Sequence, residues 1–234
     1  GLHREIEWNA LGLALHAAGR YGCRVTTTTI SRRQREYALD RVRAAGLQDR
    51  ITVLDRDYRE LEGRYDKLVS VEMIEAVGLE FLDGYFRVCS ERLKPAGRMP
   101  LQGIVIAATR EQRYEMARRS VDFIQKYIFP GGALPSVGAI QDAVARVTDL
   151  QLVGLHDIGE DYARTLREWR HRFLGQLQAV RQLGHGEEFI RMWEYYLAYC
   201  EGGFAARHVG DVQVVLTRSG NRALGPVPGY RGEA

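Results

Sequence analysis

Short apolar runs alternate with helical stretches through the first half of the chain, and this alternation limits the possible folds more than any other feature. The apolar or β-branched runs occupy residues 23–30, 51–54, 67–73 and 101–107. Between them, apolar residues recur at helical spacing over 31–46 and 81–93, which predicts two amphipathic helices. Strands that alternate with helices are typical of a mostly parallel sheet with helices on both faces, so we expect an α/β fold.

Capping and breaking residues predict where these elements end. Ser31 and Gln34 have the spacing of a capping box at the start of the first helix, and Gly46 is placed to cap its end. The Lys94–Gly97 segment contains Pro95 and Gly97 and is expected to be a loop after the second helix. Pro100 lacks an N–H for a strand ladder, so we expect it only at a sheet edge or a bulge.

The second half of the sequence is predicted to be mainly helical. Leu166, Trp169, Phe173, Leu177 and Val180 share one face of a first long helix, and residues 189–200 form a second after a turn at Gly184–Gly186. Further predicted elements are helices at 110–125 and 137–148, a loop at 127–136, and strands at 150–155 and 212–217. We expect one domain over residues 1–224, with a helical insertion at about 108–148, helices at about 160–205 and a flexible tail over 225–234.

Composition excludes several classes of protein. The hydrophobic fraction of 45% and the charged fraction of 27% are typical of a soluble globular protein. The net charge of 33 − 30 = +3 comes without a basic stripe, so no nucleic-acid partner is expected. No apolar run reaches the length of about 18 residues that a membrane span needs, and no signal-peptide layout is present, which predicts a cytoplasmic protein. The spacing of the cysteines and histidines favours neither disulfides nor a metal site.

Ligands of open α/β sheets bind at the carboxyl ends of the strands, so the residues that follow each predicted strand are the candidate site. They are Thr28–Ser31, Asp57 with Tyr58, Glu72 with Glu75, and Gln102–Ile104. Simpler interpretations stay open for some of them. Glu75 alone is also typical of an ordinary acid at a helix start, and the threonines before Ser31 also fit plain strand propensity.

Longer segments carry a resemblance to a known family. TTTTISRRQ, YDKLVSVEMIEAVG, SVDFIQKYIFPGGALPS, IGEDYARTLREWRHRF and FIRMWEYYLAYCEGGFAARHVGDVQVVL resemble the cyclopropane-fatty-acyl-phospholipid synthases and mycolic-acid cyclopropane synthases. The resemblance runs from roughly Gly12 to Arg218. It implies a class I S-adenosylmethionine-dependent methyltransferase fold, whose last strand is antiparallel.

The resemblance also implies a reaction and its partners. A methyl or methylene group would be transferred from S-adenosylmethionine to the cis double bond of an unsaturated phospholipid acyl chain, through a carbocation that loses a proton with the help of bicarbonate. Aromatic faces can stabilise such a cation, although Tyr162, Trp169 and Tyr196 at helical spacing also fit a plain core. Peripheral contact with the inner membrane face and a homodimer are compatible with this interpretation.

Individual roles follow from matched positions in the family. Glu75, Ile104 and Tyr162 match residues that hold bicarbonate. Gln102 stands where the family often has histidine, and an amide can hydrogen-bond the ion but cannot take its proton. The residues that match the methyl-donor site are Thr29, Gln34, Asp57, Tyr58 and Val71.

The start of the chain departs from the family pattern. The glycine motif E-x-G-x-G-x-G matches only at Glu5 and Gly12, which we assign to the cofactor by resemblance; Glu7, Asn9 and Leu11 occupy glycine positions. Local preference instead predicts one continuous helix over Glu5–Ala18, and family members extend further upstream, so the chain is expected to be N-terminally shortened. Two hypotheses therefore stay open: an active enzyme of this family, or a degenerate relative that binds lipid or a protein partner without catalysis.

Overall fold

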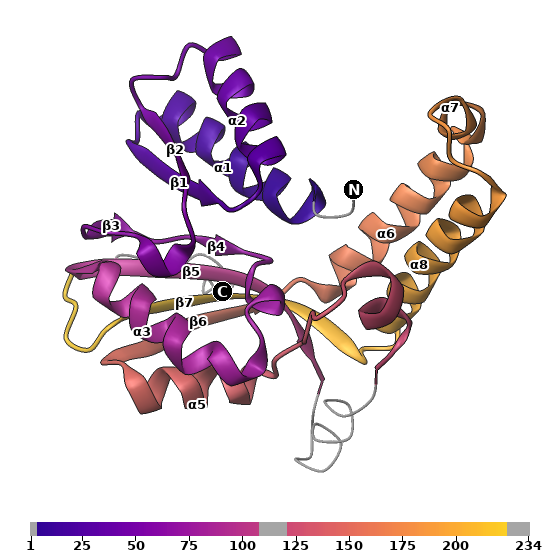
Figure 1. Cartoon of the computed structure of the whole chain (residues 1–234). Helices are drawn as coiled ribbons and strands as arrows, with labels where there is room; N and C mark the ends of the chain where they lie inside the picture. Colours follow the sequence, from indigo (N-terminus) through magenta and orange to yellow (C-terminus); the bar gives the residue numbers. More distant parts are fainter. Residues whose placement is uncertain (1–3, 108–120, 224–234) are drawn as a thin grey trace, which may run out of the picture.

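The computed structural model describes residues 4–107 and 121–223, with side chains from residue 11 onward. Two groups of strands form its sheets (Figure 1). In the first, β1 (Val25–Thr29) and β2 (Ile51–Asp55) pair in parallel. The second has the order β3–β5–β7–β6, with β4 also paired to β5. Its strands are β3 (Tyr65–Lys67), β4 (Ser70–Val71), β5 (Leu93–Ile106), β6 (Leu150–Asp157) and β7 (Val209–Arg218).

The direction of the strands confirms the predicted fold class. β3 and β4 run parallel to β5, whereas the last strand, β7, is antiparallel to both β5 and β6. The helices are distributed around the sheets (Figure 1). They are α1 (Arg4–Tyr21), α2 (Arg32–Ala44), α3 (Leu82–Arg92), α5 (Val137–Val147), α6 (Gly159–Leu174), α7 (Leu177–Gln182) and α8 (Glu187–Ala205). In the described chain, none of them is long and apolar enough to cross a membrane.

Strand β5 carries the main core on one of its faces. Met99, Leu101 and Val105 are at most 5% exposed and pack with Phe86 of α3 and Ile140 of α5. The alternate residues of β5 are only half-buried and point away from these helices. This period of two puts an apolar core on one face of the strand and leaves polar groups to the other.

The helices outside this core pack in two further groups. α1 places Leu11, Ala14 and Ala18 on one face, and these residues pack with Val42 of α2 and Val53 of β2. α6 and α8 lie side by side and project beyond the end of the sheet (Figure 1). The Glu201 carboxylate of α8 accepts from Arg167 and Arg170 of α6 at 2.8 and 3.0 Å, which fixes the pairing of the two helices.

The predicted strand at 67–73 is divided into β3 and β4, and Pro100 explains the division. Leu68 donates its N–H to the Arg98 carbonyl, so the next ladder bond would come from an N–H at position 100. Proline has none, and β4 resumes pairing only at Ser70 opposite Leu101. The expectation that Pro100 lies at an edge or bulge was wrong. Pro100 lies in the central strand β5, and the neighbouring strand is interrupted opposite it, between β3 and β4.

Several local predictions are corrected. Lys94–Gly97 lies within the bounds of β5 and is not a separate loop, because Pro95 favours extended backbone; it forms an irregular stretch between the pairs Tyr65–Leu93 and Lys67–Arg98 of β3 and β5. The first long helix ends at Leu174, with Gly175 as its cap, so Leu177 and Val180 belong to the separate α7. Ser31 is the N-cap of α2 but makes no capping bond through its side chain.

Other predictions stand, or fall outside the described residues. α1 confirms the continuous helix predicted over Glu5–Ala18, and Gly46 ends α2 with a φ of 65°. Most of the predicted helix at 110–125 lies outside the described residues, as does the tail at 225–234. Within the described residues, Ile124–Ile128 forms a π-helical turn. The single domain and its insertion stay predictions.

Replacing Phe86 tests the core of this fold. Its side chain is fully buried between α3 and β5, so we expect Phe86→Ala to lower the free energy of unfolding by about 3–5 kcal/mol. Phe81→Ala removes the same ring from a side chain that is 57% exposed and serves as the control. Urea denaturation of both variants measures the difference, and equal losses would contradict the assigned core.

Candidate active site

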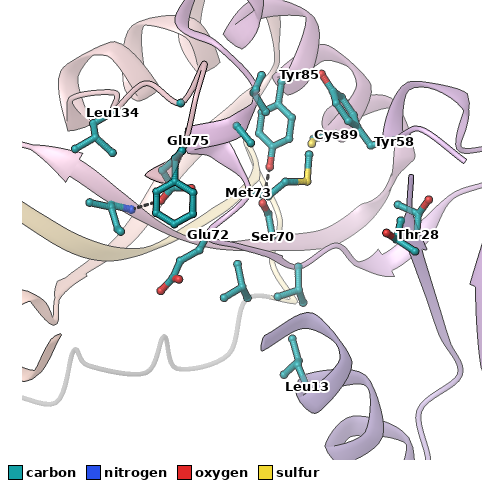
Figure 2. Close-up of a pocket in the computed structure, with 18 of the residues that line it drawn as sticks. Leu13, Thr28, Tyr58, Ser70, Glu72, Met73, Glu75, Tyr85, Cys89 and Leu134 are labelled. Atoms are coloured by element: carbon teal, nitrogen blue, oxygen red, sulfur yellow. Dashed lines mark hydrogen bonds between the residues drawn. The ribbon is translucent and has the colours of Figure 1, made fainter. Parts of the chain in front are cut away.

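A large cleft lies at the carboxyl ends of β1, β4 and β5 and continues between α6 and α8. Its volume is about 2640 Å³. Figure 2 shows part of its lining, with Glu72 and Glu75 near the end of β4, Tyr58 and Tyr85 further along, and Leu13 of α1 approaching from the opposite side. Most of the predicted site residues line this one cleft: Thr29, Gln34, Asp57, Tyr58, Val71, Glu75, Ile104 and Tyr162.

Thr29 and Gln34 are held together at the start of α2. The Thr29 hydroxyl lies 3.0 Å from Gln34 Oε1 and accepts the Ser31 N–H at 3.0 Å. This arrangement replaces the predicted capping box, because Gln34 turns toward Thr29. Thr29 ends β1 and Gln34 lies in the first turn of α2, so both flank the loop after β1, where a ligand of an α/β sheet is expected.

Asp57 and Tyr58 follow β2 and form the next wall. The Asp57 carboxylate accepts from the Arg59 backbone and from its guanidinium at 2.8–2.9 Å. Hydrogen bonding to the Arg59 side chain lowers the pKa of Asp57, so this carboxylate is ionised. The Tyr58 ring meets Tyr85 edge to face, with centroids 5.5 Å apart. This wall therefore combines a fixed negative charge with an aromatic surface.

Glu75 is the acid at the centre of the cleft. Its Oε1 accepts the backbone N–H of Ile104 at 2.5 Å (Figure 2), whereas its Oε2 is shielded from solvent and has no partner among the described residues. Burial raises the pKa of Glu75 to about 7, and the charge of Glu72 adds to this effect. A carboxyl group in this state can be protonated or ionised near neutral pH, which suits exchange of a proton with a ligand.

Gln102 does not line the cleft. Its side chain lies behind it, where Nε2 donates to Glu72 Oε1 at 3.1 Å and to Asp211 Oδ2 at 2.8 Å. Asp211 is fully buried in β7, opposite Ile104 of β5. The sequence missed Asp211 because the predicted strand began one residue later. An acid directly before the apolar VQVVL run was the available signal.

Tyr162 joins this polar group to an aromatic wall. Its hydroxyl donates to Glu72 Oε2 at 3.2 Å, and its ring stacks on Phe204 with centroids 4.7 Å apart. Burial raises the pKa of Tyr162, so the phenol stays neutral. Trp169 approaches the same ring at 6.4 Å, and Tyr196 lines the cleft nearby. Aromatic faces therefore surround the space next to Glu72 and Glu75.

The structure does not provide the glycine turn that the resemblance implied. Glu5 and Gly12 both lie within α1, and Gly12 is absent from the cleft lining. α1 instead presents Leu13, Ala17 and Tyr21 to the cleft. The geometry therefore does not support the assignment of Gly12 to the cofactor, because its N–H lies in the interior of a helix that uses such groups for its own hydrogen bonds. Glu5 lies in the first turn of α1, and its role stays a prediction.

Comparison with known proteins decides the family. The family model for mycolic acid cyclopropane synthetase matches residues 8–214. The chain belongs to this family. The resemblance drawn from the sequence is thereby confirmed, and the curated relatives carry related names.

Two curated relatives show how much is shared. The chain is 41% identical over 208 residues to the tuberculostearic acid methyltransferase of Mycobacterium tuberculosis. This alignment covers 89% of the chain and 48% of the relative. It is 38% identical over 214 residues to the cyclopropane-fatty-acyl-phospholipid synthase of Escherichia coli, covering 91% and 52%. The chain thus spans about half the length of the curated relatives it matches.

Solved structures agree on the fold. The mycolic acid cyclopropane synthase CmaA1, complexed with SAH and CTAB, superimposes with a TM-score of 0.78 at 23% identity, over 87% of the chain and 73% of that structure. The cyclopropane synthase MmaA2 of Mycobacterium tuberculosis gives 0.77 at 20% identity, over 86% and 72%. At this identity the likeness establishes the class I methyltransferase fold.

The raised pKa values predict an unusual pH dependence of stability. Burial raises the pKa of Glu75 and of Asp211 to about 7, so the folded chain holds these protons more tightly than the unfolded chain. The stabilisation is complete below the ordinary carboxyl pKa of about 4 and is lost as pH rises to about 7. We expect the free energy of unfolding to fall over this window, and Glu75→Gln to reduce the fall. Urea titrations across pH, with exposed Glu36→Gln as control, measure it; an unchanged slope in Glu75→Gln contradicts the assignment.

Proposed function

We propose that the chain transfers a methyl or methylene group from S-adenosylmethionine to the cis double bond of an unsaturated phospholipid acyl chain. The observation that carries this proposal is Glu75, an acid with one oxygen bonded to Ile104 and the other buried without a partner, facing a large cleft with aromatic walls. The names of the relatives, a cyclopropane-fatty-acyl-phospholipid synthase and a tuberculostearic acid methyltransferase among them, support this substrate class.

The donor end of the cleft fits S-adenosylmethionine on the side formed by β1, β2 and β4. There Thr29 and Gln34 offer hydroxyl and amide groups, the Asp57 carboxylate can accept from an exocyclic amine, and Tyr58 offers an aromatic face. Val71 supplies an apolar wall. When bound, the donor provides an electrophilic methyl group on a sulfonium centre, and these residues would hold and orient it.

The acceptor end fits an unsaturated acyl chain. The cleft continues past Ile104 along Ile124, Phe129 and Tyr196, whose side chains are apolar or aromatic. An alkene is a weak nucleophile, so its double bond must be held in line with the methyl group. Addition of the methyl group leaves a cation on the chain, and the faces of Tyr162 and Phe204 can stabilise it by about 0.5–2 kcal/mol each.

Removal of a proton completes the proposed reaction. Bicarbonate, if bound, supplies a base that a cation cannot alkylate as it would a protein carboxylate. Glu75, Ile104 and Tyr162 are the residues that would surround such an ion by resemblance to the family. The Ile104 N–H already donates to Glu75 Oε1 and the Tyr162 hydroxyl to Glu72 Oε2, so Tyr162 could only accept from the ion. Glu75 fits this task because, when protonated, its buried Oε2 can donate to an anion. The breaking C–H bond leaves its electron pair to close the three-membered ring.

The acyl chain brings the protein to a membrane surface in this proposal. Tyr127, Tyr195 and Tyr199 are 43–52% exposed and cluster around Phe123 near the mouth of the cleft. Tyrosine rings suit the boundary between lipid and water. Peripheral contact through this cluster would let an acyl chain enter the cleft.

Glu75→Gln separates methyl transfer from donor binding. The amide keeps the shape of the side chain but removes its titratable proton, so we expect methyl transfer to unsaturated phospholipid vesicles to be lost, by at least about 100-fold. Calorimetric titration with S-adenosylmethionine should give the same affinity for Glu75→Gln and for the unchanged chain. Loss of both would mean that Glu75 is structural.

Donor binding itself tests the enzyme interpretation. We expect a dissociation constant below about 1 mM, equivalent to about 4 kcal/mol. Thr29→Val should weaken it by removing the hydroxyl that joins Gln34, whereas Thr52→Val, at an exposed position of β2 outside the cleft lining, should not. No measurable binding by the chain would favour the degenerate relative that binds lipid or protein without catalysis.

A further inference from the structure

One amide holds two buried carboxyl groups, Glu72 at the lining of the cleft and Asp211 behind it, and the proposed reaction gives neither of them a task. Gln102 Nε2 lies 3.1 Å from Glu72 Oε1 and 2.8 Å from Asp211 Oδ2. Gln213 donates to Gln102 Oε1 at 3.0 Å, which fixes the orientation of the amide. Both protons of the Gln102 amide are therefore given to carboxyl groups, one directly after β4 and one in β7.

Burial makes two negative charges at this place costly. Asp211 is 0% exposed and Glu72 is 8% exposed. Oδ1 of Asp211 has no hydrogen-bond partner among the described residues. Two carboxyl groups that share one donor in a buried site repel each other when both are ionised, so one of them retains its proton. In agreement, burial, together with the charges of Glu72 and Glu75, raises the pKa of Asp211 to about 7.

Among the described residues, the groups that shift the pKa of Asp211 include no cation. The titratable groups that face Asp211 are Glu72 after β4, Glu75 after the same strand, Asp157 of β6 and Tyr162 of α6. Arg207, the nearby cation, pairs with Glu160 on the surface. The groups around Asp211 are therefore acids and a neutral phenol, which favour a protonated carboxyl.

We infer that Glu72 and Asp211, bridged by Gln102, form a carboxyl pair that keeps one proton and takes up a second from the cleft through the Tyr162 hydroxyl. Tyr162 donates to Glu72 Oε2 at 3.2 Å and lines the cleft. The phenol passes its proton to Glu72 and takes one from the cleft, so the tyrosine is unchanged and the pair becomes neutral. Gln102 is a positioning residue: it holds both carboxyl groups through its amide N–H groups and does not itself titrate.

This inference rests on the proposed function for the origin of the second proton, which is the one lost from the new methyl group when the ring closes. The retention of the first proton is independent of that reaction. The two parts can therefore be tested separately, since the first needs neither S-adenosylmethionine nor lipid.

Infrared titration of the chain with ¹³C-labelled aspartate carboxyl groups tests the pair, and the label separates Asp211 from Glu75. We expect a protonated aspartic acid band that titrates at about pH 7 and is absent from Asp211→Asn. Glu72→Gln removes the neighbouring charge, so the midpoint should move to lower pH. Asp161→Asn changes an exposed acid of α6 and should leave the band unchanged.

Two results would overturn the pair: no protonated aspartate band near neutral pH, or a midpoint that Glu72→Gln does not move.

The second proton is tested by the pH profile of methyl transfer to vesicles. A wild-type profile in Asp211→Asn would overturn proton uptake while the pair itself stands. A chain that titrates as expected but transfers no methyl group contradicts the proposed function, not the pair.

Discussion

The packing of one face of β5 against α3 and α5 is the constraint on which the site depends. Met99, Leu101 and Val105 enter the core, so the period of two in a strand sends Gln102 and Ile104 to the opposite face. A slip of one residue would bury Gln102 among apolar side chains and expose Leu101. The hydrophobic core therefore fixes which residues face the cleft and the carboxyl pair behind it, before any polar interaction contributes.

The polar face keeps a strained residue in place. Glu72 has a φ of 48°, which side-chain-bearing residues rarely adopt. Its N–H donates to the Gln102 carbonyl at 2.9 Å, and its two carboxylate oxygens accept from Gln102 and Tyr162. Such backbone is retained where the surroundings determine it, and it concentrates at functional sites. The same contacts that hold Glu72 in this conformation bring it between the cleft and Asp211.

The sequence predicted the elements and the strand ends well, because both follow from local periodicity and capping. Glu72 and Glu75 were found in this way, since Glu72 lies near the end of the predicted strand at 67–73 and Glu75 follows it. Asp211 and the division of β3 from β4 were not found, because they depend on pairing between distant strands. Asp211 is revealed by the strand register, which sets it beside Ile104. The division of β3 from β4 is revealed by Pro100, which cannot supply the ladder hydrogen bond at that point. Gln102 was placed correctly on its strand, but its partners follow from the sheet and not from its neighbours in sequence.

The two ends of the cleft differ in what determines them. The end that contains Glu72 and Glu75 is built from β4, β5, β7 and α6, whose packing leaves its side chains little freedom. The donor end depends on α1, which offers Leu13 and Ala17 to the cleft in place of backbone N–H groups. Without such groups, affinity for a charged donor has to come from side chains after β1 and β2, chiefly Thr29, Gln34 and Asp57. Changes in α1 should therefore alter donor affinity without disturbing the carboxyl pair, because the two ends share no hydrogen bond through the described residues.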